Sequence, residues 1–282
     1  MAKTIEYLGF PNCIELANGS ARVVLSTDFG PRILFYGLDE NENILGWHPE
    51  AAVNTPLGTW KPYGGHRLWV APENMPLSYA PDNDPIGYEI LDELDARVMQ
   101  LPGQVPIKKQ MRVQLDGEGS GVRIEHKLTN EADEVMNVSA WALTIMRPGG
   151  EVSIPNEPFA PYSHETLLPI RSMALWSYTD FTDPRWRFET ERICLRVDES
   201  IGSQQKFGVL NKQGWAAYQW QDLTFTKRFD HIDGQTYPDM NSNTEVYTAG
   251  GFVEIETLSP LKTLQPGESI SHTERWGLTR GQ

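Results

Sequence analysis

The apolar residues of this chain recur with a period near two along almost its whole length, and this pattern constrains the fold most. Clusters of Gly, Pro, Asn and Asp separate the runs. Because side chains alternate between the two faces of a strand, the pattern is typical of β-strands joined by turns. Helical signals are few and short. Many short strands at this spacing predict an all-β sandwich or barrel.

The composition is that of an ordinary globular protein that can bury a large core. The chain has 282 residues, of which 39% are hydrophobic and 22% are charged. β-rich folds of this size routinely form one unit, and no repeat, linker or low-complexity tract divides the sequence. We therefore expect a single domain over residues 1–282.

Charge and cysteine content narrow the classes of partner. The formal net charge of −14 disfavours nucleic acid and anionic membranes, because both would be repelled. A small neutral molecule fits better, bound by a monomer or a homodimer. Cys13 and Cys194 are the only cysteines, so neither a disulfide framework nor a cysteine metal site is predicted. With no secretory signal and no long apolar run, a cytoplasmic location is expected.

Near the C-terminus, a predicted strand over residues 252–258 places two carboxylates on one face. Glu254 and Glu256 point the same way, whereas Val253 and Ile255 point to the other face. Buried like charges raise each other's pKa, which suits a general base near neutral pH. The alternative is an exposed strand whose acids only aid solubility.

A long irregular stretch, residues 46–87, breaks the alternating pattern and is rich in aromatic residues and prolines. Long structured loops are often functional. The pair Gly64 and Gly65 allows close approach of a ligand or of another strand. The candidate site residues that follow this pair are His66, Arg67, Trp69 and Glu73. The alternative is an aromatic minicore capped by an ion pair between Arg67 and Glu73.

A third cluster, between residues 227 and 247, mixes charged and amide side chains with aromatic rings. Such groups hydrogen-bond hydroxyls, while aromatic faces lie against the apolar face of a sugar ring, as in a carbohydrate cleft. Its candidate binding residues are Lys227, Asp239, Asn243 and Glu245. For residues 239–243 the alternative is a simple turn.

The C-terminal segment resembles the closing strands of aldose 1-epimerases, the galactose mutarotases. It reads Gly-Phe-Val-Glu-Ile-Glu-Thr over residues 251–257, then Leu-Gln-Pro-Gly-Glu over 264–268 and His-Thr at 272–273. Residues 64–73 and 237–247 look like a branch of the galactose mutarotase-like superfamily that has no assigned function. The resemblance implies a β-supersandwich of two large antiparallel sheets with a sugar site on its concave face. Glu256 matches the catalytic base of the family.

The resemblance also implies a mechanism, from which this chain departs at one position. In mutarotases a glutamate removes the anomeric hydroxyl proton while a histidine protonates the ring oxygen. The strand that carries this histidine in the family corresponds here to residues 137–146, which contain Trp141 but no histidine. His66 is our first candidate for the general acid and His231 the second. Trp69 and Trp141 would stack on the sugar ring.

Two other classes of function stay open. A sugar-binding or sugar-sensing protein would keep the cleft without turnover, and Glu256 would then be an acceptor only. Contacts from Arg67 or Lys227 would indicate an anionic substituent on the sugar. The acids of the third cluster could hold a structural calcium ion, but no metal motif is present, so no metal and no cofactor are predicted.

Overall fold

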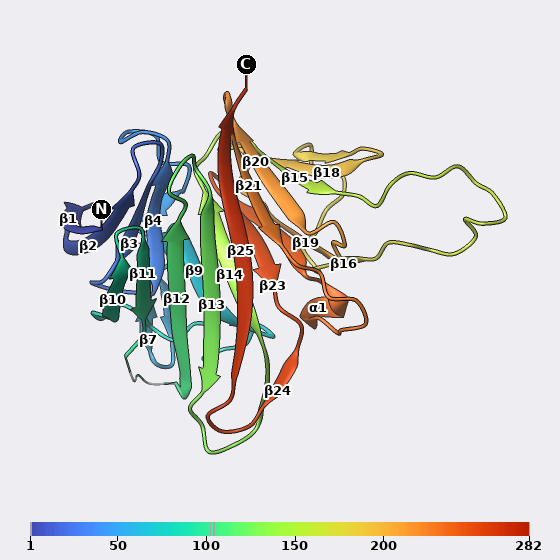
Figure 1. Cartoon of the computed structure of the whole chain (residues 1–282). Coiled ribbons are helices and arrows are strands. Elements are labelled where there is room, and N and C mark those ends of the chain that lie inside the picture. The colour runs from blue at the N-terminus through green and yellow to red at the C-terminus, as the bar shows by residue number, and fades with distance from the viewer. Residues whose placement is uncertain (1, 102, 104, 282) are drawn as a thin grey trace.

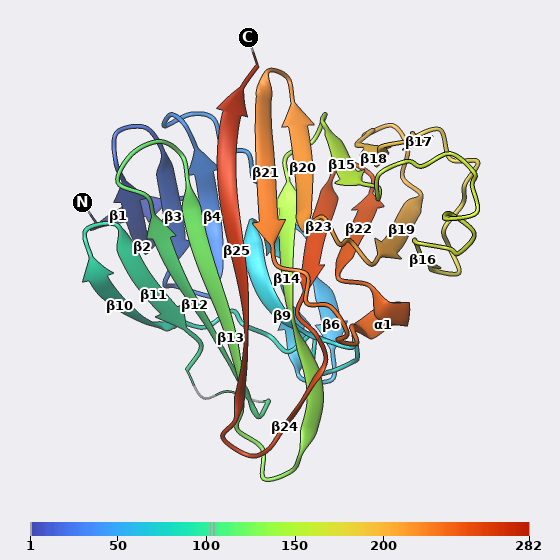
Figure 2. The same cartoon turned by 45° about the vertical axis from the view of Figure 1, so that its right-hand side comes forward.

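The structure, a computed structural model, describes residues 2–101, 103 and 105–281. Two large antiparallel sheets pack face to face (Figures 1 and 2), with two small strand pairs beside them. The predicted all-β supersandwich of two large antiparallel sheets is confirmed. In the described part of the chain, no helix has the length and apolar character needed to cross a membrane.

The first sheet runs from edge to edge through β1 (Lys3–Tyr7), β2 (Phe10–Ala17), β3 (Arg22–Ser26), β4 (Arg32–Gly37), β9 (His66–Ala71), β14 (Met136–Met146), β23 (Val253–Leu258), β22 (Thr244–Ala249), β19 (Gln204–Val209) and β16 (Met173–Leu175), while β24 (Lys262–Leu264) also pairs with β14.

The second sheet runs through β10 (Gly87–Asp92), β11 (Asp95–Met99), β12 (Ile107–Leu115), β13 (Val122–Asn130), β25 (Ser269–Arg280), β21 (Leu223–Phe229), β20 (Trp215–Trp220), β15 (Glu151–Pro155), β18 (Arg192–Arg196) and β17 (Trp186–Phe188). The small pairs are β5 (Trp47–His48) with β8 (Tyr63–Gly64) and β6 (Val53–Thr55) with β7 (Gly58–Trp60).

Strands β12 and β13 show why the period of two indicated the fold. Each buries every second residue, so one face joins the core between the sheets and the other meets solvent. Met111 and Ile124, for example, are fully buried. Their antiparallel pairing extends to Leu115 and Val122, so residues 116–121 connect the two strands as a hairpin.

The predicted irregular stretch over residues 46–87 was wrong in its centre, because β9 is an interior strand of the first sheet. It lies between β4 and β14, and all six of its residues are buried. A strand covered on both faces lacks the exposed polar positions that mark alternation in a sequence. Gly64 and Gly65 have φ of 117° and 69°, and a Cβ there would lie 2.2 Å from Gly46 O and 2.1 Å from Ile33 O. The lack of a side chain at Gly64 and Gly65 therefore allows the backbone at Gly46 and Ile33 to pack closely against them.

Among the described residues one short helix is assigned, α1 (Pro238–Asn241), and it is in fact a turn. Asp239 and Met240 have φ of 49° and 57°, in the left-handed region. The turn predicted for residues 239–243 as the alternative to a binding cluster is thus present at its start.

Candidate functional site

A cleft of about 580 Å³ lies on the first sheet, on the face that points away from the second sheet. Its floor comes from the central strands β9, β14, β23, β22 and β19, and its walls come from segments between residues 48 and 79. The predicted site residues that line it are Arg67, Trp69, Glu73, Trp141, Glu254 and Glu256. Residues far apart in sequence therefore meet on one surface.

Strand pairing explains this meeting. Trp141 lies opposite Trp69, and Leu143 lies between Arg67 on one side and Glu256 on the other. Since directly paired residues point to the same face, the alternation of each strand brings these side chains to the cleft together. The two carboxylates predicted to share one face of a strand, Glu254 and Glu256, do so.

Two buried carboxylates, one of them in the cleft floor, share one ammonium group. Glu256 of β23 pairs directly with Glu245 of β22, an arrangement that like charges make unfavourable. Lys206 of β19 relieves it, because its Nζ lies 2.9 Å from Glu245 Oε2 and 3.1 Å from Glu256 Oε2. All three side chains are buried. Glu245 supports the cleft from below, through Lys206, and is not itself part of the lining.

Burial sets the protonation of this group. Loss of solvent raises the pKa of both Glu256 and Glu245, which the charge of Lys206 offsets only in part. Although burial alone lowers the pKa of Lys206, the two carboxylates raise it well above its usual value. The lysine stays charged, while the carboxyl pair holds a proton more tightly than an exposed carboxyl does. One protonated and one ionised carboxyl can serve as an acid and a base.

The two carboxylate oxygens of Glu256 differ in their hydrogen bonding. Trp141 Nε1 donates a hydrogen bond of 2.9 Å to Glu256 Oε2, the same oxygen that Lys206 contacts. Glu256 Oε1 is buried and has no hydrogen-bond partner among the described residues. The carboxylate is thus fixed in orientation through Oε2, while Oε1 is a buried acceptor beside the carboxyl group of Glu245.

Arg67 forms the second ion pair of the cleft. Its Nη2 donates a hydrogen bond of 3.0 Å to Glu254 Oε1, and its guanidinium lies over the rings of Trp69 and Trp60, 4.5 Å and 5.4 Å from their centroids. Stacking on aromatic faces stabilises a buried guanidinium. Its Nε and Nη1, and the Nε1 atoms of both tryptophans, have no hydrogen-bond partner in the described chain.

The ion pair predicted between Arg67 and Glu73 does not form. Glu73 instead accepts a hydrogen bond from the hydroxyl of Tyr79 at the mouth of the cleft. Glu73 lies beyond the end of β9, whereas Glu254 shares the cleft face with Arg67. The aromatic minicore itself is real, since Trp60, Trp69 and Tyr79 pack against one another.

The structure places His66 in the interior and not at the cleft. As the neighbour of Arg67 on β9, it points to the opposite face and lies between the sheets. Its Nε2 is 2.6 Å from His126 Nε2 and its Nδ1 is 2.9 Å from Thr144 Oγ1. This position argues against the predicted role as general acid.

Lys227 belongs to the same interior cluster, since its Nζ lies 2.9 Å from Glu274 Oε1. Ligand atoms of His66, His126 and Glu274 lie within 4.8 Å of one another, close enough to hold a metal ion. However, the Nε2 atoms of His66 and His126 lie 2.6 Å apart, at hydrogen-bond distance, and the Nδ1 atoms contact Thr144 Oγ1 and the backbone oxygen of His272. The cluster is complete as a hydrogen-bond network, and we assign no metal to it.

The remaining predicted residues lie off the cleft. Asn243 donates to the backbone oxygen of Asn211 and also lies 3.3 Å from His231 Nδ1. Asp239 sits in the α1 turn, and His231 Nε2 is 3.1 Å from Asp233. None of these three predicted side chains is part of the lining.

Lys206 and His48 are among the cleft residues that the sequence did not point to. Lys206 begins a short apolar run, a position that gives no sign of a buried charge. His48 lies in β5, within the same aromatic stretch that drew attention to His66, and its ring packs 5.1 Å from Phe252. Burial lowers the pKa of His48, so the ring is mostly neutral near pH 7.

Fold and cleft together define the class of protein: a β-supersandwich with an aromatic and charged cleft on the outer face of one sheet. This is the fold of galactose mutarotase-like proteins. A galactose mutarotase-like protein from Lactobacillus casei aligns with a TM-score of 0.61 at 11% identity, over 95% of this chain and 100% of its own. No protein-family model matches the sequence, and comparison with curated proteins finds no match.

Two further solved structures show the same likeness. A candidate aldose 1-epimerase from Klebsiella pneumoniae has a TM-score of 0.63 at 12% identity, over 99% of this chain and 83% of its own. A galactose mutarotase related enzyme from Lactobacillus acidophilus has a TM-score of 0.59 at 8% identity, over 96% and 98%. At these identities the likeness establishes the fold, and function has to be argued from the cleft.

Proposed function

We propose that the cleft binds a carbohydrate or closely related polyol and interconverts its anomers, with Glu256 as the general base. The observation that carries this proposal is the oriented Glu256, whose Oε1 has no partner in the described chain and whose pKa is raised. Arg67, Trp60 and Trp69 also line the cleft, and each has an N–H group without a partner among the described residues. A sugar hydroxyl both donates and accepts, so it needs both kinds of group.

In this proposal Glu256 Oε1 takes the proton of the anomeric hydroxyl while Trp141 and Lys206 hold Oε2 in place. The ring then opens as its oxygen gains a proton, the aldehyde rotates, and closure gives the other anomer. His48 lines the cleft, as His66 does not, and we assign the donation to the ring oxygen to the protonated form of its ring, which becomes neutral in the step. Effective proton transfer requires such groups within hydrogen-bond reach of the substrate.

The charges of the cleft favour a neutral sugar. Arg67 is paired with Glu254, and Lys206 is shared by two carboxylates. Neither cation has an unpaired charge to offer a phosphate or a uronate, and each added anion would face Glu254 and Glu256. We therefore expect neutral aldoses to bind before their acidic derivatives.

A second candidate function is sugar binding without turnover. It is favoured by the lowered pKa of His48, because a mostly neutral imidazole is a weak acid for the ring oxygen. Under this alternative, Glu256 only accepts a hydrogen bond from a sugar hydroxyl.

Anomer exchange followed by NMR on a panel of neutral aldoses, uronates and sugar phosphates separates these outcomes. For an epimerase, wild-type protein accelerates exchange, and Glu256→Gln lowers that rate by about 10²-fold or more. Glu89→Gln, on an exposed outer strand, is the matched control and keeps full activity. Line broadening without acceleration would identify a binding protein, whereas no effect with any sugar would overturn both functions.

A further inference from the structure

A long arm, residues 158–172, leaves the body between β15 and β16 and extends away from both sheets (Figure 1). All fifteen of these consecutive residues are exposed. Figure 2 shows the same segment beyond the edges of the two sheets, next to β16 and β17. The arm therefore contributes almost nothing to the core of its own chain.

The arm nevertheless carries large apolar side chains. Tyr162 and Leu168 are 87% and 81% exposed, and Phe159, Leu167 and Ile170 are each more than half exposed. Single exposed apolar residues are common on proteins, but a cluster of them marks an interaction surface.

The arm also has a defined conformation before it binds a partner. Three prolines, at positions 158, 161 and 169, restrict its backbone. The hydroxyl of Thr166 donates to the backbone oxygen of Pro161, which closes the tip. At the neck, Arg171 Nε donates to Glu157 Oε2 at 3.1 Å. An arm held in one shape loses less conformational entropy when it binds.

A second apolar surface, which we call the base, adjoins the arm on residues 173–188. It exposes Leu175, Tyr178, Phe181 and Phe188. Arm and base together hold nine of the 17 large apolar side chains that the described chain exposes, within thirty residues. Such a concentration at one end of the molecule points to a partner that covers both surfaces.

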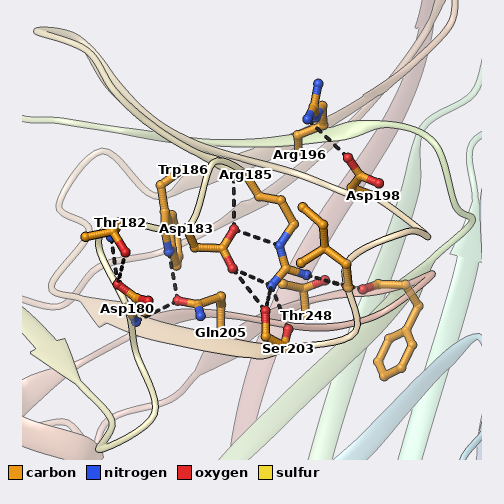
Figure 3. A network of polar contacts seen from close by, with 12 residues as sticks. Asp180, Thr182, Asp183, Arg185, Trp186, Arg196, Asp198, Ser203, Gln205 and Thr248 are labelled. Carbon is orange, nitrogen blue, oxygen red and sulfur yellow. Dashed lines mark hydrogen bonds and ion pairs between the residues drawn. The ribbon is translucent and has the colours of Figure 1, made fainter.

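A network of polar contacts ties the base to the body of the molecule (Figure 3). Arg185 is buried and donates to Asp183 with Nε at 3.0 Å and Nη2 at 2.8 Å, and to the backbone oxygen of Ser203 at 2.6 Å. Trp186 Nε1 donates to Gln205 Oε1 at 2.9 Å. Phe181 and Phe188, whose ring centroids lie 5.5 Å apart, are thus displayed by a fixed segment.

Charge identifies the kind of partner. Residues 159–188 contain three acids and three arginines, so their net charge is zero on a chain whose net charge is −14. Those six residues are Glu165, Asp180, Asp183, Arg171, Arg185 and Arg187. Two copies of so acidic a chain repel each other over most of their surfaces, but not at this end.

We propose that the chain forms a two-fold dimer in which the arm of each copy packs on the base of the other. An isologous interface needs two complementary surfaces on the same chain, and the arm and the base supply them. At roughly 100 Å² for each of nine large side chains, each copy buries about 900 Å², near the ~800 Å² of a standard interface. Because Tyr178 lines the cleft as well as the base, the partner's arm lies beside the cleft rim.

Light scattering on the full chain, separated by size, tests this dimer at micromolar concentration. The expected mass is twice 31.9 kDa. Leu168→Glu in the arm and Phe181→Glu in the base should each give monomers with an unchanged circular dichroism spectrum. Ile90→Glu, at an exposed position on β10, is the matched control and stays dimeric. A monomeric wild type, or a dimer that survives both changes, would overturn the proposal.

Cysteine cross-linking then locates the contact. Cys13 and Cys194 are buried, so Leu168→Cys and Phe181→Cys introduce the accessible thiols. Mixing these two variants under mild oxidation should yield a disulfide-linked pair of chains. In the double variant, a link within one chain would instead show that the arm folds onto its own base, and would overturn the dimer.

Discussion

Two clusters of buried charge lie on opposite faces of the first sheet, and only one of them is complete. The interior cluster surrounds Glu274, between the sheets, and the cleft cluster surrounds Glu256. In the interior, Lys227 and Thr257 donate to Glu274 Oε1 and Trp276 donates to Oε2. In the cleft, Glu256 Oε1 has no partner among the described residues.

The pKa shifts of Glu274 and Glu256 also differ between the two clusters. Burial alone would raise the pKa of Glu274, but Lys227 and three histidines lower it well below its usual range. Burial raises the pKa of Glu256, and Lys206, shared with Glu245, offsets this only in part. A buried charge with all its partners stabilises the fold, whereas one with a free oxygen can act on a ligand.

The largest expected effect is in the interior. Glu274→Gln leaves Lys227 buried without its counter-charge, so we expect unfolding free energy to fall by about 3–5 kcal/mol. Urea denaturation followed by circular dichroism measures this loss. A change below about 1 kcal/mol would show that the interior cluster does not hold the sheets together.

The next effect separates the histidines of the two faces. His48→Gln, in the cleft, should slow anomer exchange by about 10²-fold while stability stays within about 0.5 kcal/mol. His126→Gln, in the interior, should leave the rate of anomer exchange unchanged and cause a large loss of stability. If His48→Gln exchanges anomers at the wild-type rate, another group protonates the ring oxygen.

Acid should weaken the interior cluster. The pKa of each of the buried imidazoles His66, His126 and His272 lies below 6.5, and for His272 it is about 3. The unfolded chain binds these protons first as pH falls. Stability is therefore full above pH 6.5 and declines toward pH 3, by up to about 1.4 kcal/mol per pH unit for each histidine.

Over part of that pH range, the carboxyl groups of the cleft cluster have the opposite effect on stability. Because the pKa values of Glu245 and Glu256 are raised, the folded state binds their protons first and gains stability as pH falls toward 4.5. Glu256→Gln removes part of this gain. Stability measured from pH 7 to pH 4 should then fall more steeply in the variant, and an equal slope would contradict the raised pKa.

The smallest expected effect is the change in stability caused by Glu256→Gln at pH 7, in contrast to the large loss expected for Glu274→Gln. At pH 7, Glu256→Gln replaces a carboxylate whose ionised form burial disfavours, and Lys206 keeps Glu245 as a partner. We expect stability to stay within about 1 kcal/mol of wild type or to rise. Thermal unfolding beside Glu274→Gln measures the difference between the two faces, and equal losses would mean that both clusters are structural.

The fold could be predicted from the sequence because the long strands of the second sheet bury one face only. Strands such as β12 and β13 keep the period of two. The carboxylate pair Glu254 and Glu256 could be predicted for the same reason, since alternation fixes which residues share a face.

The sequence analysis placed His66 at the site because β9 was not recognised as a strand. Once β9 is placed, alternation sends Arg67 and Trp69 to the cleft and His66 to the interior. Lys206 and Glu245 reach Glu256 only through the order of β19, β22 and β23, which local patterns do not specify. Long-range strand order, rather than residue type, is what the sequence left open.

The most direct test of this account is a carbon-13 NMR titration of the glutamate carboxyls, assigned with Glu245→Gln, Glu256→Gln and Glu274→Gln. The account predicts that the Glu245 and Glu256 pair titrates above 4.5, and that Glu274 stays ionised to well below 4.5. If Glu256 instead titrates at or below 4.5, the cleft carboxylate is an ordinary ion-pair partner, and its proposed role as a general base is contradicted.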